Sequence, residues 1–177
     1  CDSSEPDAPF QDIFRALGLR RILINWLLEQ QQAVVNTSGT FPTTAVLAAN
    51  SITTLACQLL AQSVRKHTAN QLELFEFLDE LTSQIAVPDS CSVEFVLEQM
   101  FSNNEQIASQ LATSGAKTFE SLMSPLLELS CKKRRNFIGL KVLQNMVVVH
   151  DAPLPLAKRV LLDLLRAEIP PTSSTSG

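Results

Sequence analysis

The densest charge feature of this 177-residue chain is a run of four cations, Lys132, Lys133, Arg134 and Arg135. Adjacent ammonium and guanidinium groups can bind an anion or an acidic peptide through charge-assisted hydrogen bonds. Three interpretations are open: a contact for an acidic partner, a solvated start of a helix, and a nuclear-localisation signal. Because the N-terminus of a helix carries partial positive charge, four cations there oppose the helix dipole, which keeps the binding interpretation open.

The other residue types that do chemistry are scattered. The four cysteines lie far apart, at positions 1, 57, 91 and 131, with no Cys-x-x-Cys pair and no Cys/His spacing typical of zinc. His67 and His150 fall at the expected ends of helices, where the dipole accounts for them. There is no phosphate-binding loop and no nucleophile elbow. We therefore predict no catalytic residue, no metal site, no cofactor and no small-molecule substrate.

Charge and hydropathy restrict the class of partner. The net charge of −4 and the isoelectric point near 5.2 give no electrostatic basis for a nucleic-acid partner, and none is expected. Polar residues interrupt every apolar run well short of the roughly 18 residues that cross a membrane, so no membrane span is expected. Dispersed cysteines favour a reducing compartment, which predicts an intracellular protein, cytoplasmic or nuclear. Because the sequence starts with Cys1, we expect a piece of a longer protein.

The composition and the apolar spacing predict a helical domain. Leucine dominates the apolar residues and only five glycines are present, a balance that favours helices over sheet. We expect an acidic N-terminal segment over 1–9, a helical domain over 10–169 and a tail over 170–177. Within the domain, apolar residues at spacings of three and four predict helices near 10–18, 19–35, 43–67, 70–87, 92–101, 103–115, 116–130, 132–149 and 155–169.

Several residues predict local features of these helices. Gly18 is placed to end a helix in the left-handed conformation, Gly115 to end another, and Asn103 or Asn104 to begin one. Pro125 lies inside a helix and is expected to kink or divide it. Apolar residues cover most of the circumference of the helix that starts near 132, which predicts packing on both sides.

Two groups of charges have less obvious roles. Arg20 and Arg21 stand at the start of a helix, where the dipole disfavours them, and a nearby carboxylate would account for their position. Acidic residues from Glu73 to Glu80 form one face of the helix over 70–87. That face is either solvent-exposed or a dock for a basic partner.

Residues 103–149 resemble an armadillo repeat. The resemblance is carried by the Asn-Glu-Gln-Ile opening at 104–107, the break at Gly115-Ala116, the leucines at 122 and 126, and Leu-Gln-Asn-Met at 143–146. A weaker copy starts at 10 and has its break at Gly18, and residues 70–101 form a middle copy that lacks the glycine. The two break glycines are 115 − 18 = 97 residues apart, about two periods of the roughly 40–47 residues of such repeats.

The resemblance implies an all-α, right-handed superhelix of about three stacked repeats plus a closing helix. It further implies a non-enzymatic scaffold, part of a larger intracellular protein, that binds a peptide or helix of a partner in a groove lined by the third helices. Asn145 matches the groove asparagine of the nuclear-import members, and Lys141 stands where those members carry a tryptophan. Together with the run over 132–135, these two residues are the predicted contacts with a partner, possibly an acidic one.

Two alternatives remain at this point. For function, the chain can be the helical regulatory or substrate-recruiting region of a large multidomain enzyme such as an E3 ubiquitin ligase. For fold, a HEAT-type repeat or a plain helical bundle is the alternative, although the glycine break at 115 favours the armadillo form. The partner and the parent protein are not given by these residues.

Overall fold

The structure is a computed structural model that describes residues 8–36, 43–86, 93–132 and 137–168. The ten α-helices of these residues are α1 (Ala8–Ala16), α2 (Leu19–Asn36), α3 (Thr43–Val64), α4 (Thr68–Phe75), α5 (Leu78–Ser83), α6 (Val93–Phe101), α7 (Glu105–Ser114), α8 (Ala116–Lys132), α9 (Phe137–Val147) and α10 (Pro155–Glu168). A 3₁₀ turn, η1 (Gln84–Ala86), follows α5, and two short strands, β1 (Val148–Val149) and β2 (Ala152–Pro153), lie between α9 and α10. The prediction of an all-α domain is confirmed.

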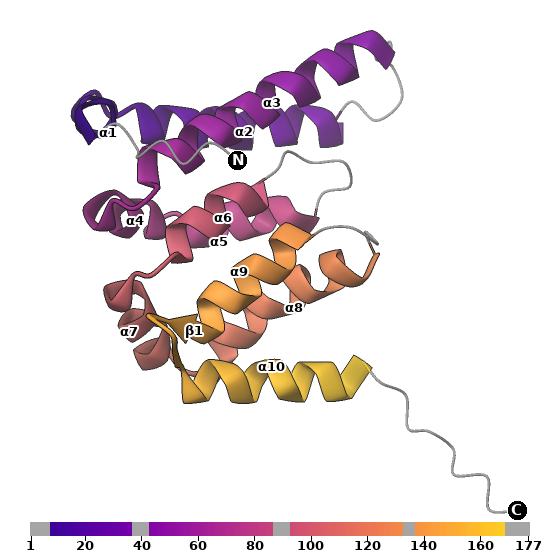
Figure 1. Cartoon of the computed structure of the whole chain (residues 1–177). Helices are drawn as coiled ribbons and strands as arrows, with labels where there is room; N and C mark the ends of the chain where they lie inside the picture. The colour runs from indigo at the N-terminus through magenta and orange to yellow at the C-terminus, as the bar shows by residue number, and fades with distance from the viewer. Residues whose placement is uncertain (1–7, 37–42, 87–92, 133–136, 169–177) are drawn as a thin grey trace, which may run out of the picture.

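The helices are stacked in chain order from one end of the molecule to the other (Figure 1). Helices α1, α2 and α3 pack on one another at one end, and α7, α8 and α9 lie towards the other. Helix α6 lies between α3 and α9 and packs on both, so that these three helices follow one another through the stack. Helix α10 closes the far end against α8 and α9. One continuous cluster of buried apolar side chains extends through the stack from α2 to α10.

Glycines and an asparagine set the breaks between helices, as the sequence predicts. Gly18 and Gly115 have φ angles of +64° and +91°, a region that favours glycine. Asn104 caps α7, since its side-chain oxygen accepts from the backbone N–H groups of Gln106 and Ile107 at 3.1 and 3.2 Å. These caps turn the chain sharply enough for short helices to pack beside long ones.

Three predicted boundaries are wrong. The helix expected over 70–87 is divided into α4, α5 and η1, with the break at Phe77, whose backbone lies outside the helical region (φ −105°, ψ 23°). Helix α8 runs through Pro125 to Lys132 without being divided, because packing against α9 and α10 compensates for one lost backbone bond. Helix α9, expected to begin near 132, therefore begins at Phe137.

Helix α9 packs on α6 and on α8, in agreement with the prediction of packing on both sides. Val142, Leu143 and Met146 are buried in these contacts, whereas Phe137 and Leu140 are 70% and 50% exposed. The helix therefore keeps one apolar strip uncovered by the described residues. After it comes a hairpin that the apolar spacing does not reveal, in which Val148 pairs with Pro153 across a two-residue turn.

The turn of this hairpin is formed by His150 and Asp151, both at positive φ (48° and 62°), the geometry of a type I′ turn. His67 likewise differs from the expectation of a basic helix end. It precedes α4 as its N-cap and accepts from the backbone N–H of Asn70 through Nδ1 at 3.3 Å. Both histidines thus occupy turn or cap positions, not helix C-termini.

Buried glutamines hold the C-terminal ends of α3 and α6. Gln11, on α1, donates to the carbonyl oxygens of Gln62 and Arg65 at 2.8 and 2.9 Å. Gln71, on α4, donates to the carbonyl oxygens of Gln99 and Ser102 at 2.7 and 3.1 Å. The last carbonyls of a helix have no partner within the helix, so in both cases a side chain of a short helix supplies the missing donors. The two ends that carry Gln62, Arg65 and Gln99 are thereby fixed in position.

Candidate functional site

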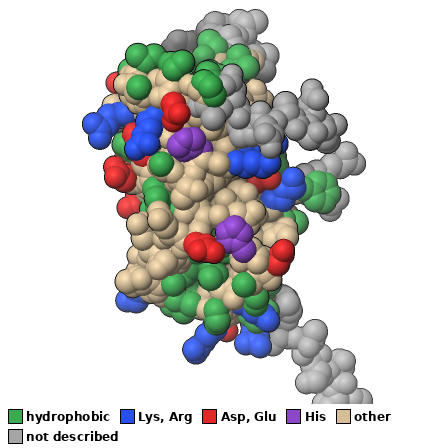
Figure 2. Space-filling view, turned by 60° about the vertical axis from the view of Figure 1, so that its left-hand side comes forward, with side chains coloured by type: hydrophobic (Ala, Val, Ile, Leu, Met, Phe, Trp, Pro, Cys, Tyr) green, Lys and Arg blue, Asp and Glu red, His purple; other side chains and the backbone are tan. Residues whose placement is uncertain are grey.

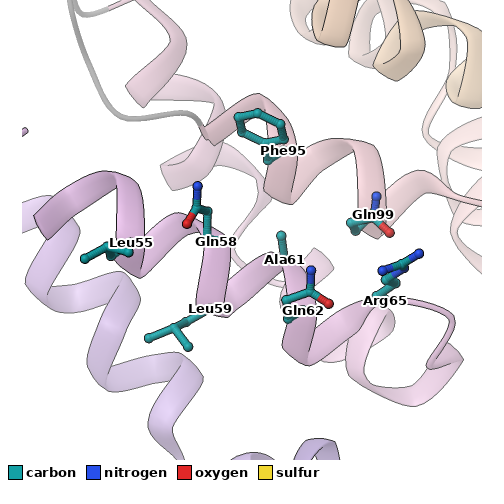
Figure 3. A pocket seen from close by; sticks show the side chains of 8 residues that line it. All are labelled: Leu55, Gln58, Leu59, Ala61, Gln62, Arg65, Phe95 and Gln99. Carbon is teal, nitrogen blue, oxygen red and sulfur yellow. The ribbon is translucent and has the colours of Figure 1, made fainter. Parts of the chain in front are cut away.

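A groove of about 490 Å³ lies between α3 and α6 (Figure 3). Its lining combines apolar side chains, three primary amides and one guanidinium: Leu55, Gln58, Leu59, Ala61, Gln62, Arg65, Phe95 and Gln99. Five of these come from α3, Arg65 directly follows its end, and two come from α6, so the groove runs along the last three turns of α3. We call it the α3–α6 groove.

The spacing of residues on α3 explains why a groove forms here. Cys57, Leu60 and Val64 are buried and face the core. Gln58 and Gln62, one turn apart, point the other way and are exposed. Ala61, small and buried, leaves room beside them, and α6 packs along α3 without filling it. The result is a hollow with an apolar base and a polar rim.

The chemistry of the α3–α6 groove is that of hydrogen bonding and charge. Within the described residues, the side-chain amides of Gln58, Gln62 and Gln99 make no hydrogen bond, and the guanidinium of Arg65 makes no ion pair. The groove contains neither a nucleophile nor a carboxylate among its lining residues. An arrangement of this kind can bind a ligand that offers carbonyl oxygens, N–H groups and a negative charge.

The structure places two of the predicted contact residues together on α9. Lys141 Nζ lies 3.5 Å from a carboxylate oxygen of Glu98, on α6. Asn145 donates from Nδ2 to the backbone carbonyl of the same Glu98 at 3.0 Å. The amide of Asn145 therefore joins α9 to the backbone of α6. Both residues belong to the α6–α9 packing, one helix further along the stack than the α3–α6 groove.

The described residues do not show the basic run over 132–135 beside Lys141 and Asn145. Lys132 is the last residue of α8, and nothing further is described of its side chain. Lys133, Arg134 and Arg135 lie outside the described residues. Its role as a contact for a partner stays a prediction.

Sequence reasoning missed Gln58, Gln62, Arg65 and Gln99. A signal was present, since 58, 62 and 65 are spaced by four and three, which places three polar side chains on one face at the end of the helix. The partner across the groove, Gln99, carries no such signal. Only the packing of α6 on α3 brings it there.

A second polar cluster joins α1, α2 and α4. Arg20 is 3% exposed, and its Nη2 donates to a carboxylate oxygen of Glu73, which also lies 3.3 Å from Nε of Arg15. Burial lowers the pKa of Arg20, and the charge of Glu73 opposes that shift. Glu73 is the carboxylate that the position of Arg20 required. The acidic face over 73–80 therefore has a basic partner within the chain at one of its residues.

Arg21, which follows Arg20 at the start of α2, also makes a contact within the chain. Arg21 lies over the ring of Phe77, with its guanidinium carbon 5.8 Å from the ring centre. On the face shown in Figure 2, basic side chains lie near the upper histidine and at the lower end, and acidic side chains flank the lower histidine. The described side chains of this face therefore carry charges of both signs.

No group of three His, Cys, Asp or Glu side chains within the described residues could hold a metal ion. Within the same ranges, none of the helices combines the length and the hydropathy needed to cross a bilayer.

The sequence model of the RIH domain, the ryanodine and inositol trisphosphate receptor homology domain, matches residues 3–167, nearly the whole chain. Domains of this kind occur in large intracellular receptor channel proteins. The resemblance to armadillo repeats is therefore wrong as an assignment of family. The residues that carried it encode caps, breaks and packing positions, which stacked helices of different families share. None of the curated proteins and none of the solved structures compared with this chain matches it.

Proposed function

Because the chain belongs to the RIH-domain family, we propose that it is a non-enzymatic interaction module of a larger intracellular protein of the receptor-channel type. The α3–α6 groove is the surface on which a segment of another protein docks. The observation that carries this proposal is a groove whose three amides and one guanidinium are all without partners in the described residues. Polar groups of this kind can exchange their hydrogen bonds to water for bonds to a ligand, with a net gain of about 0.5–1.5 kcal/mol for each bond.

Support also comes from the way the groove is built. Gln11 and Gln71 bond the backbone carbonyls of Arg65 and Gln99, so the backbone from which these two side chains project is fixed before a ligand arrives. A pre-organised site loses less conformational entropy on binding than a mobile one. We further propose that the sets α1–α3, α4–α6 and α7–α9 act as repeats of a right-handed superhelix closed by α10, so that the groove lies along its surface.

The test is site-specific photo-crosslinking. A photoreactive amino acid replaces Gln62 in the groove or, as control, Glu120, an exposed residue of α8. We expect an adduct with a partner from Gln62 and none from Glu120. An excess of unlabelled chain should abolish the adduct, and the same excess of chain carrying Gln58→Ala and Gln99→Ala should not. Equal adducts at both positions, or equal competition by both chains, would contradict docking in the groove.

The predicted basic contacts are a second part of this proposal. The run over 132–135 and Lys141 supply positive charge at α8 and α9, which suits an acidic partner. We expect Lys133→Glu combined with Lys141→Glu to weaken capture of the partner and to lower the thermal unfolding midpoint only slightly, because Lys141, which loses its ion pair with Glu98, is a largely exposed lysine. A loss of folding as large as the loss of capture would show that these charges support the structure instead.

A further inference from the structure

The α3–α6 groove has a periodicity that fits an extended polypeptide. Gln58 and Gln62 are four residues apart on α3, so their side chains recur about every 6 Å along the helix. In an extended chain, residues on the same side recur about every 6.6 Å. Each primary amide has a donor and an acceptor, which match the carbonyl oxygen and the N–H of one peptide group. Two glutamines in this register can therefore bond alternate peptide groups of one strand.

The two ends of the groove differ in chemistry. Leu55 and Leu59 lie at one end and are 58% and 46% exposed, and Phe95 stands nearby on α6 (Figure 3). Arg65 lies at the other end, half-buried and without an ion pair among the described residues. From Leu55 to Arg65 the helix rises about 15 Å over ten residues. An extended peptide covers that distance in four to five residues.

We propose that the α3–α6 groove binds an extended segment of a partner that carries an apolar side chain and, four residues away, an aspartate or glutamate. This inference rests on the proposed function and specifies its ligand. The apolar side chain lies on Leu55 and Phe95, the glutamines bond the main chain, and the carboxylate pairs with Arg65. The choice of an acid follows from charge complementarity, since Arg65 is the charged residue in the lining and has no counter-charge among the residues that the structure describes. Residues four apart in an extended chain point to the same side, as the groove requires.

The probe is an array of N-acetylated, C-amidated heptapeptides with serine at five positions and every pair of residue types at the second and sixth. The full chain is applied as wild type, as Arg65→Glu, as Gln58→Ala with Gln62→Ala, and as Lys158→Glu, a control on the exposed face of α10. For the wild type we expect the strongest binding to peptides with an apolar residue at one variable position and an acid at the other. Blocked termini ensure that the acid is a side chain and not a chain end.

The variants separate the parts of the inference. Arg65→Glu should change the preferred charge from acidic to basic. The double glutamine variant should bind every peptide about tenfold more weakly, the factor that corresponds to two hydrogen bonds of modest net strength. Lys158→Glu should bind as the wild type does.

Two outcomes overturn the inference but leave docking in the groove intact. The first is that the wild type shows no preference for peptides with an acid. The second is that Arg65→Glu prefers the same peptides as the wild type, while the double glutamine variant binds all peptides more weakly. Failure of the wild type to bind any peptide also overturns the inference, and the crosslinking experiment then decides on the groove by itself. Binding that is unchanged in both groove variants places the peptide elsewhere and contradicts the proposed function as well.

Discussion

Gln71 offers the sharpest test of how the groove is held in place. It is 1% exposed, and its amide nitrogen donates to the carbonyl oxygens of Gln99 and Ser102. Its amide oxygen accepts from Asn104 Nδ2 at 2.9 Å. The change Gln71→Glu keeps the size and shape of the side chain but replaces the donor with an acceptor. At neutral pH it places a carboxylate against two carbonyl oxygens in the interior.

The expected cost follows from these contacts. Two hydrogen bonds, each of about 1 kcal/mol net, are lost. A buried carboxylate without a cation adds to this, and breaking a buried polar or charged pair typically costs about 3–5 kcal/mol in all. We therefore expect the free energy of unfolding at pH 7 to fall by about 3–5 kcal/mol, a large part of the roughly 5–15 kcal/mol of an ordinary domain.

The cost should depend on pH in a known direction. Burial and the two carbonyl dipoles raise the pKa of the new Glu carboxyl in the folded state above its unfolded value of about 4.3. A raised folded pKa means that the folded protein binds the proton more tightly than the unfolded chain does. The variant therefore approaches the wild-type stability below about pH 4.3 and loses stability as pH rises through the folded pKa. When protonated, the carboxyl can also donate to one of the carbonyls.

The assay is urea unfolding followed by far-ultraviolet circular dichroism at pH 7 and pH 4, with the wild type measured at both. Gln58→Glu is the matched control, because it makes the same chemical change on an exposed residue. We expect the control to change stability by no more than about 0.5 kcal/mol at either pH. If Gln71→Glu resembles Gln58→Glu at pH 7, or if its deficit is the same at both pH values, the assignment of Gln71 as a donor to the end of α6 is wrong.

Three further predictions concern the packing of the stack. Gly139→Ala should lower the free energy of unfolding in urea by about 1 kcal/mol, because a Cβ there meets Ser130 Oγ at 2.5 Å and this clash outweighs the gain in helix propensity. In a chain that also carries Ser130→Ala, the clash is absent, and Gly139→Ala should raise the free energy of unfolding by about 1 kcal/mol. Glu73→Gln leaves the buried arginine at the start of α2 without its counter-charge and should cost about 3 kcal/mol, whereas no change in urea would show that this arginine needs no carboxylate. Leu143→Asp should abolish the cooperative thermal transition, because Leu143 is 3% exposed and the change buries a charge. Leu140→Asp, on the exposed side of the same helix, should shift the unfolding midpoint by only a few degrees. Similar effects of the two changes would contradict the assignment of Leu143 to the buried face of α9.

Features that depend on neighbours in the chain were predictable. Helix breaks at Gly18 and Gly115 and the cap at Asn104 follow from backbone conformations and short hydrogen bonds within a few residues. Buried stripes such as Leu122 and Leu126 follow from the helical period, which depends on spacing alone. The all-α class rests on the sum of these local signals. The assignment of family did not follow, because such signals are common to many stacked helices.

Features that depend on contacts between distant segments were not predictable. No glycine marks the helix break at Phe77 in the sequence, so this break is seen only in the packed structure. Gln71 and Gln99 are polar residues among many in the sequence, and only the stacking of α4 on α6 makes one a buried donor to the backbone of the other. The α3–α6 groove likewise needs two helices separated by nearly thirty residues of chain. The sequence by itself determined which helices form and which faces are apolar, because these are local properties; the tertiary structure decided which polar groups are satisfied inside the fold and which stay exposed at its surface.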